Sequence, residues 1–179
     1  GVQPDILVCR TEYNLNDDLK RKIALFCNIQ FESVIESIDA DTIYDVPLLM
    51  QEQKLDKVVL EKLDLPIGEN PEMKTWRAFL KHIKHPESEV EIALVGKYIE
   101  LKDSYKSILE AFNHAGASNS CKVNIRWIHA EEVTNDTAAK LLDGVHGVLV
   151  APGFGERGIE GKIKAIKHVR ENNIPFLGI

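Results

Sequence analysis

The chain has 179 residues, of which 44% are hydrophobic and 28% charged, proportions typical of a folded globular protein. Its 28 acidic and 22 basic residues give a net charge of -6, which argues against a surface that binds nucleic acid by neutralising phosphates. No stretch approaches the roughly 18 uncharged apolar residues of a membrane span, and the first residues lack the pattern of a signal peptide. We therefore expect no nucleic-acid or membrane partner and a cytoplasmic location.

Residues 1–65 predict a small α/β segment. A buried strand is expected at 5–9, then a helix capped by Asn16, then a second strand at 33–38. The following residues are helical in composition but contain Pro47, which predicts two short helices because proline lacks the amide hydrogen that a helix interior needs.

Residues 66–89 are interpreted as a linker with one helix. Proline-containing stretches at 64–71 and 85–89 flank a predicted helix at about 72–84. One apolar stripe on that helix is expected to pack on a neighbouring domain, and it consists of Trp76, Phe79, Leu80 and Ile83. His82 and His85 are three residues apart, but no third ligand is evident, so no metal site is predicted.

Residues 90–179 alternate apolar strands with helices, which predicts a doubly wound α/β fold with a parallel sheet covered on both faces. The predicted strands are 90–96, 122–128, 146–152 and 174–179, and the predicted helices are 101–116, about 131–142 and 158–172.

A glycine-rich loop, "APGFGERGIEG", joins the third of these strands to the last helix. Gly153, Gly155 and Gly158 match the G-x-G-x-x-G pattern of a dinucleotide-binding loop, but Glu156 and Glu160 place negative charge where a pyrophosphate would bind. The glycines could instead only permit a tight turn and a close helix approach. A third hypothesis is that a bare backbone N–H in this loop stabilises an oxyanion during acyl transfer.

Longer stretches of the sequence resemble the CTP synthase family. The segments "LVGKYIELKDSYKSILEA", "APGFGERGIEGKIKAI" and "RENNIPFLGI" are similar to the first half of that family's glutamine amidotransferase domain. The segments "GVQPDILVCR", "RKIALFCN" and "IDADTIYDVP" are similar to the end of its synthetase domain. The resemblance implies that residues 1–65 end the synthetase domain and residues 90–179 begin the amidotransferase domain.

This resemblance also implies a reaction and its ligands. Members of the family convert UTP to CTP: ATP phosphorylates the uracil 4-oxygen, and ammonia released from glutamine displaces the phosphate. It implies Mg²⁺ for the phosphoryl transfer, GTP as activator, CTP as inhibitor and a homotetramer. Glutamine hydrolysis would use a Cys, His and Glu arrangement, in which the family nucleophile follows Ile179 immediately.

The resemblance assigns roles to residues in the second half of the chain. Gly153 corresponds to the glycine whose backbone N–H helps to form the oxyanion hole and touches glutamine. Pro152 replaces a glycine found in most relatives, and because proline has no N–H, Gly153 must supply the donor. A lid segment associated with the GTP effect corresponds to Arg157, Gly158 and Glu160. For Lys97 and Tyr98 we expect a structural or lid-contact role.

In the first half, Lys22 corresponds to a lysine that contacts the pyrimidine nucleotide. The segment that lines the ATP adenine pocket corresponds to Ile38, Asp39 and Ala40. We expect this stretch, which starts without methionine and stops in an apolar run, to be an inactive piece of an enzyme. The alternatives are a nicotinamide-dependent oxidoreductase domain and a non-catalytic nucleotide-sensing module.

Overall fold

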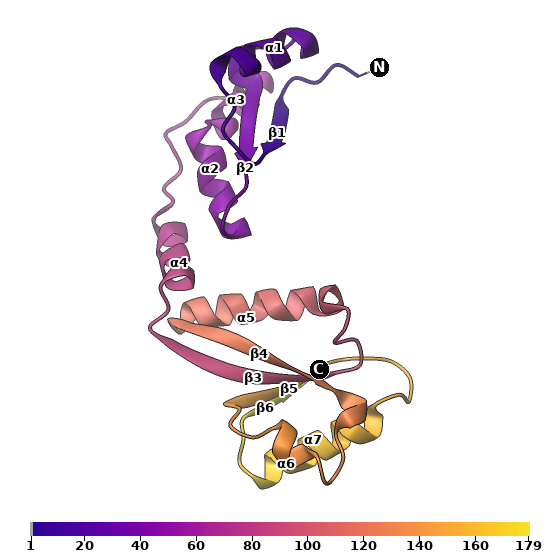
Figure 1. Cartoon of the computed structure of the whole chain (residues 1–179). Coiled ribbons are helices and arrows are strands. Elements are labelled where there is room, and N and C mark those ends of the chain that lie inside the picture. The colour runs from indigo at the N-terminus through magenta and orange to yellow at the C-terminus, as the bar shows by residue number, and fades with distance from the viewer. Residues whose placement is uncertain (1) are drawn as a thin grey trace. The chain divides into compact units, whose positions relative to one another are not determined.

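The computed structural model describes residues 2–179, and contacts within the chain divide it into two units, of which the first ends at Trp76 and the second runs from Arg77 to Ile179 (Figure 1). No helix in the described residues is both long and apolar enough to cross a bilayer. Each unit contains its own parallel sheet.

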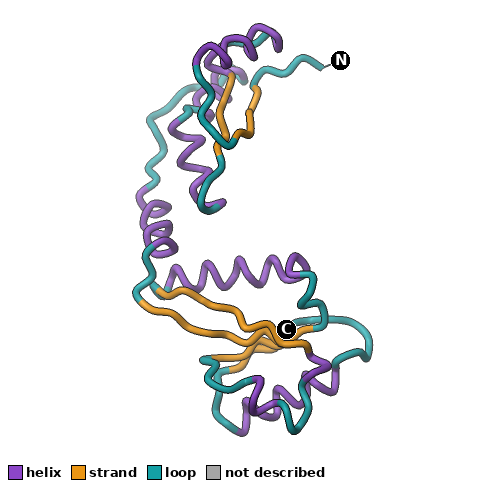
Figure 2. Tube along the Cα trace, viewed as in Figure 1, coloured by secondary structure: helices purple, strands orange, loops and turns teal. Residues whose placement is uncertain are grey.

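Unit 1 is built on two parallel strands, β1 and β2, paired in register from Leu7 with Val34 to Thr11 with Ile38. Three α-helices and two 3₁₀ turns accompany them (Figure 2). The elements are β1 (Leu7–Thr11), α1 (Asp17–Cys27), a 3₁₀ turn (Phe31–Ser33), β2 (Val34–Ile38), a second 3₁₀ turn (Ile43–Asp45), α2 (Val46–Glu52) and α3 (Leu55–Lys62).

Local sequence explains where these helices begin and end. The Asn16 side chain accepts a hydrogen bond from the Leu19 amide at 2.8 Å, so the predicted cap of α1 is confirmed. Two short helices follow β2 as predicted, but the interpretation of Pro47 as the interruption is wrong. Pro47 lies in the first turn of α2, where its missing N–H costs nothing, and the chain breaks instead at Lys54, whose φ is 58°.

The predicted linker helix is α4 (Lys74–Lys84), which begins in unit 1 and continues in unit 2. Within unit 1, the Trp76 indole N–H donates to the Tyr44 carbonyl at 2.9 Å. Within unit 2, Leu80 is buried and the Phe79 ring lies edge-on to His114. His82 Nδ1 lies 2.9 Å from the Ser120 hydroxyl and 3.0 Å from the Ala117 carbonyl oxygen, so this imidazole is part of local packing.

Unit 2 contains a four-stranded parallel sheet in the order β4-β3-β5-β6. Its strands are β3 (Ser88–Gly96), β4 (Cys121–His129), β5 (Gly147–Val150) and β6 (Phe176–Gly178). Its helices after α4 are α5 (Lys106–Ser118), α6 (Ala138–Leu141) and α7 (Ile159–Glu171), with 3₁₀ turns at Lys102–Tyr105 and Ala130–Glu132. The predicted doubly wound α/β arrangement is confirmed, because α5 lies on one face of the sheet and α6 and α7 on the other (Figure 1).

The two faces of this sheet carry separate cores. Alternate residues of one strand point to opposite faces, so Ala93 and Val95 pack with α6 and α7 while Leu94 packs with Tyr105. All three β3 residues are fully buried. Buried strands with helices on both sides are what a parallel sheet requires.

The helix predicted at about 131–142 is wrong in length, because only Ala138–Leu141 is α-helical. Side-chain hydroxyls compete here with the helical hydrogen bonds. The Thr137 hydroxyl donates to the Glu132 carbonyl at 2.6 Å and accepts from the Thr134 amide at 2.8 Å. The chain therefore runs extended at Val133 before the helix starts.

A candidate oxyanion site at the carboxyl edge of the second sheet

Two loops of unit 2 meet where the strand order of the sheet reverses. From β3 the chain crosses to β4 on one side, whereas β5, the other neighbour of β3, leads on to β6. The loop that starts at Lys97 and the loop 151–158 therefore leave adjacent strands at the same edge. In open α/β sheets this is where ligands bind.

The glycine loop projects from this edge and is mostly exposed. Residues 152–157 are all exposed, and the Phe154 side chain is 99% accessible. Gly155 and Gly158 have φ of 77° and 75°, a conformation that side chains disfavour, so these two glycines are needed for the turn itself. Gly153 does not have a positive φ, so the turn itself does not require glycine there.

Lys97 lies beneath the loop and holds two of its carbonyl groups. Although it carries an ammonium, Lys97 is only 3% exposed. Its Nζ donates to the carbonyl oxygens of Phe154 and Gly155, each at 2.7 Å. Because N–H and C=O point in opposite directions across a trans peptide, this turns the amides of Gly155 and Glu156 away from Lys97. The expected structural role of Lys97 agrees with this geometry.

Lys162, on the first turns of α7, holds the loop at its other end. Its Nζ donates to the Ala151 carbonyl oxygen at 2.7 Å. Burial lowers the pKa of Lys162, and the nearby positive charge of Lys97 lowers it further. Sequence analysis missed this residue, since a lysine at this helical position looks like an ordinary surface cation.

Gly153 lies between these two anchors. A Cβ placed on Gly153 would lie 3.2 Å from Lys97 Cδ, a tight contact, and 3.6 Å from Lys162 Nζ, an ordinary one. Within residues 2–179 no protein acceptor takes the Gly153 amide hydrogen. The peptide that the sequence analysis singled out thus has its donor available at the carboxyl edge of the sheet.

Arg157 connects the end of the glycine loop to its neighbours. Its guanidinium donates to Glu131 Oε1 at 3.0 Å and to the Lys97 carbonyl oxygen at 3.3 Å, and it lies 5.6 Å from the centre of the Tyr98 ring. The predicted lid-contact role of Tyr98 is consistent with this stacking. Glu160 is exposed in the first turn of α7.

Tyr105 fixes the start of the other loop. Its buried hydroxyl accepts from the amides of Lys97 at 3.0 Å and Tyr98 at 3.2 Å. Gly96 leaves room for that hydroxyl, since a Cβ there would lie only 2.5 Å from it. The strand end and the lysine beneath the loop are therefore positioned by one tyrosine.

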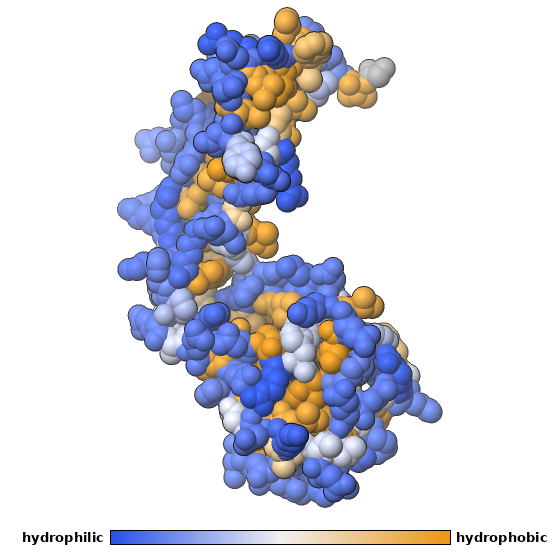
Figure 3. All heavy atoms as spheres, in the orientation of Figure 1, coloured by the Kyte–Doolittle hydropathy of each residue, from blue (hydrophilic) through white to orange (hydrophobic). Residues whose placement is uncertain are grey.

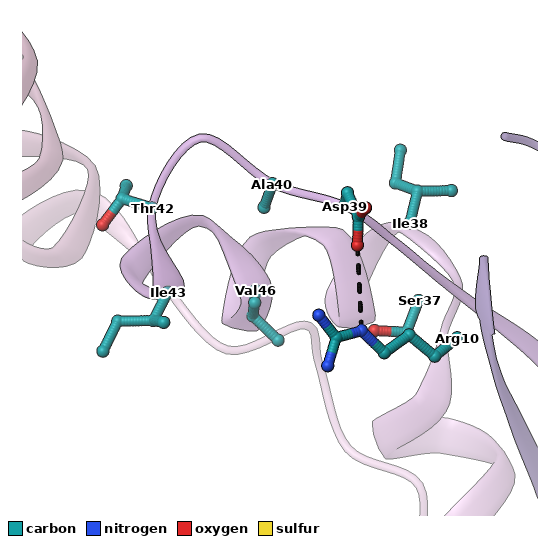
Figure 4. A pocket seen from close by; sticks show the side chains of 8 residues that line it. All are labelled: Arg10, Ser37, Ile38, Asp39, Ala40, Thr42, Ile43 and Val46. Atoms are coloured by element: carbon teal, nitrogen blue, oxygen red, sulfur yellow. Dashed lines mark ion pairs between the residues drawn. The ribbon is translucent and has the colours of Figure 1, made fainter. Parts of the chain in front are cut away.

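In unit 1, the residues assigned to adenine line a pocket of about 470 Å³ at the carboxyl end of β2 (Figure 4). Ile38, Ala40 and Val46 supply apolar surface, while Arg10 and Asp39 form an exposed ion pair at 3.7 Å. The Asp39 amide already donates to the Thr11 carbonyl at 3.1 Å. The pocket wall is mixed, since Arg10, Ser37, Asp39 and Thr42 line it beside the apolar side chains.

Lys22 is exposed on α1, and its neighbour Lys20 has a different environment. Lys20 forms an ion pair with Glu36, and the Glu36 carboxylate also accepts from the Leu15 amide at 2.7 Å. Burial raises the pKa of Glu36, but these hydrogen bonds outweigh it and the net pKa lies below the ordinary value. Sequence analysis missed this pair, because only the fold brings the two residues together.

Comparison with known proteins identifies both units. Residues 1–65 match the family model described as CTP synthase N-terminus, and residues 100–179 match the model of class-I glutamine amidotransferases. Curated CTP synthases from Cytophaga hutchinsonii and Flavobacterium psychrophilum are 61% and 62% identical to this chain over all 179 residues. Both units of the chain thus match CTP synthases in sequence. The chain spans about a third of the length of these relatives, since it covers 33% of each.

More distant members of the CTP synthase family also align with the whole chain, among them the enzyme of Caldanaerobacter subterraneus at 52% identity and 33% coverage of its length. A solved structure, the Trypanosoma brucei CTPS glutaminase domain with bound acivicin, is 40% identical. The match covers 50% of this chain and 35% of that one, with a TM-score of 0.47.

Metal ligands are not gathered in the described part of the chain. Across residues 2–179 no group of three or more His, Cys, Asp or Glu lies close enough together to hold a metal ion.

Proposed function

We propose that this segment is part of a ligase that makes CTP from UTP, ATP and ammonia released from glutamine. In this proposal residues 1–65 form the C-terminal part of the nucleotide-binding synthetase domain, residues 66–89 connect the domains, and residues 90–179 form the N-terminal half of the amidotransferase domain. The observation that carries it is the identity of about 60% to CTP synthases along the entire chain.

The part played by unit 2 is to stabilise charge during glutamine hydrolysis. As a nucleophile attacks the glutamine amide, its carbonyl oxygen becomes an oxyanion, and the Gly153 N–H donates to that oxygen. The nucleophile and its base come from residues outside the 179. We therefore propose that the segment by itself is catalytically silent.

In the same proposal unit 1 contacts nucleotides. Lys22 provides an exposed ammonium for a UTP or CTP phosphate, and the pocket lined by Ile38, Asp39 and Ala40 accepts the adenine of ATP. Arg157, Gly158 and Glu160 belong to a lid through which GTP activates. Mg²⁺, inhibition by CTP, the homotetramer and a cytoplasmic location complete the proposal as features of the whole enzyme.

Neither alternative is favoured. A dinucleotide site would leave the loop amides facing a pyrophosphate beside the exposed Glu156 and Glu160, and the matching family is of amidotransferases. A nucleotide-sensing module would bind nucleotide without releasing glutamate from glutamine.

The test uses the full-length protein that carries this segment, supplied with UTP, ATP and either glutamine or ammonium. We expect CTP from both nitrogen sources. Replacing Gly153 with proline removes the N–H and should abolish CTP formation from glutamine while ammonium still supports it. If the unmodified protein forms no CTP from either source, or the proline variant uses glutamine normally, the proposal is wrong.

A further inference from the structure

The two lysines beneath the glycine loop form an unusual pair, which we call the lysine pair, Lys97 and Lys162. Both are close to Gly153: its hypothetical Cβ would lie 3.4 Å from Lys97 Cε and 3.6 Å from Lys162 Nζ. Within residues 2–179 neither ammonium forms an ion pair with a carboxylate, and both donate to backbone carbonyls instead. Two like charges held together in this way need a reason, because they repel each other.

Their hydrogen bonds hold the backbone on both sides of Gly153. Lys162 fixes the carbonyl before Pro152, at Ala151, and Lys97 fixes the carbonyls after Gly153, at Phe154 and Gly155. Two peptides lie between the fixed ones, Pro152–Gly153 and Gly153–Phe154, and the first carries the Gly153 N–H. Its direction is thus set from both sides, although the loop itself is exposed.

The anchors also come from different elements. Lys97 follows β3, where Tyr105 holds its backbone amide, and Lys162 belongs to α7. The loop is therefore attached to the sheet on one side and to the helix on the other. Pro152 restricts φ at the entry to the loop, which further limits its motion.

We propose that Lys97 and Lys162 are positioning residues for glutamine hydrolysis: they hold the Gly153 N–H toward the reacting carbonyl, and their unneutralised charges favour the oxyanion. Both effects act on the transition state more than on bound glutamine, whose carbonyl carries only a partial charge. The lowered pKa of Lys162 agrees with a partly buried cation near a second cation. This inference rests on the proposed function and adds two residues to it.

The test compares Lys97→Met and Lys162→Met with Lys167→Met in the full-length protein. Methionine keeps the hydrophobic stem and removes the donor and charge. Lys167 lies on the same helix as Lys162 but its side chain is 61% exposed, so it controls for loss of a helical lysine. In the first two variants we expect kcat for glutamine hydrolysis to fall by roughly 10- to 100-fold. KM for glutamine and CTP formation from ammonium should stay within about twofold.

Two results would contradict the positioning role of Lys97 and Lys162. Glutamine hydrolysis within twofold of the Lys167→Met level would overturn the inference. Equal losses of glutamine- and ammonium-dependent CTP formation would also overturn it, because they would indicate a general structural role. If the unmodified protein uses neither nitrogen source, the proposed function fails, and hydrogen exchange of residues 151–158 then tests the anchoring. Exchange should be faster in Lys97→Met and Lys162→Met than in Lys167→Met, and unchanged exchange would contradict it.

Discussion

Gly161 in α7 offers a sharp test of the packing that supports the glycine loop. A Cβ at this position would lie 1.6 Å from the Ala130 carbonyl oxygen, 2.7 Å from its carbon and 3.2 Å from the Val133 carbonyl oxygen. These are backbone atoms, so no side-chain rotation relieves the contact. Helix α7 can approach the Ala130–Glu132 turn this closely only with glycine at 161.

Two effects of Gly161→Ala have opposite signs. Alanine in a helix interior is favoured over glycine by about 1 kcal/mol. Overpacking costs about 1–3 kcal/mol or more, and here α7 would have to move by roughly 2 Å to restore van der Waals distance. That shift would pull the buried Ala165 and Val169 out of the core. We therefore expect a net loss of about 2 kcal/mol, with a fall in Tm of roughly 10 °C for a unit of this size.

The assay is unfolding of the full-length protein in urea, followed by the fluorescence of Trp127 after every other tryptophan, Trp76 included, is replaced by phenylalanine. Trp127 is half-buried in unit 2, where its ring lies 6.2 Å from that of Tyr105. Gly68→Ala is the control, because a Cβ there would have no neighbour within 4 Å, and it should change stability by less than about 1 kcal/mol. A Gly161→Ala variant as stable as the parent would refute the close approach of α7.

Three further predictions concern buried polar contacts. Tyr105→Phe leaves the amides of Lys97 and Tyr98 without their acceptor, so unit 2 should lose about 1–3 kcal/mol in urea unfolding, and no measurable loss would contradict that hydrogen-bonding role. Lys20→Met leaves the buried Glu36 carboxylate without its cation, which should destabilise unit 1 by about 3 kcal/mol at neutral pH. The pKa of Glu36 in the folded protein lies below 4.5, so the ion pair stabilises the folded state above that pH and stops doing so as the pH falls through the pKa of the folded state. The stabilities of Lys20→Met and the parent should therefore converge in acid. A stability difference that does not change with pH would count against the ion pair. The Arg126 guanidinium donates two hydrogen bonds to the Glu91 carboxylate, at 3.1 and 2.5 Å, and so holds the pKa of Glu91 below its ordinary value. Arg126→Met should therefore raise the pKa of Glu91 in an NMR titration. An unchanged pKa would exclude this contact in solution.

Sequence alone predicted the order and type of most elements, because their signals are local. The cap at Asn16, the strand β2 and the strand–helix alternation of unit 2 follow from side chains within a few residues of each other. Prediction from sequence failed where one residue type is compatible with two different local structures. Pro47 can break a helix or begin one, and Thr134 and Thr137 can sit in a helix or take over its hydrogen bonds.

Sequence analysis pointed to Gly153 and to a structural or lid-contact role for Lys97, but it did not show that Lys97 and Lys162 hold the glycine loop together. Figure 3 shows polar side chains over much of the visible face of each unit, and lysines are expected at such positions. Lys97 and Lys162 differ from such lysines only because β3 and α7 bring them beneath one loop.

The sequence by itself thus determined the α/β class and the family, since periodicity and long matching segments are properties of the chain. Tertiary structure alone decided which carbonyls the lysines hold, which glycine touches a backbone and which lysine pairs with Glu36. The physical reason is range: a cap or a turn depends on neighbours in the chain, whereas burial and charge pairing depend on residues brought together from distant positions.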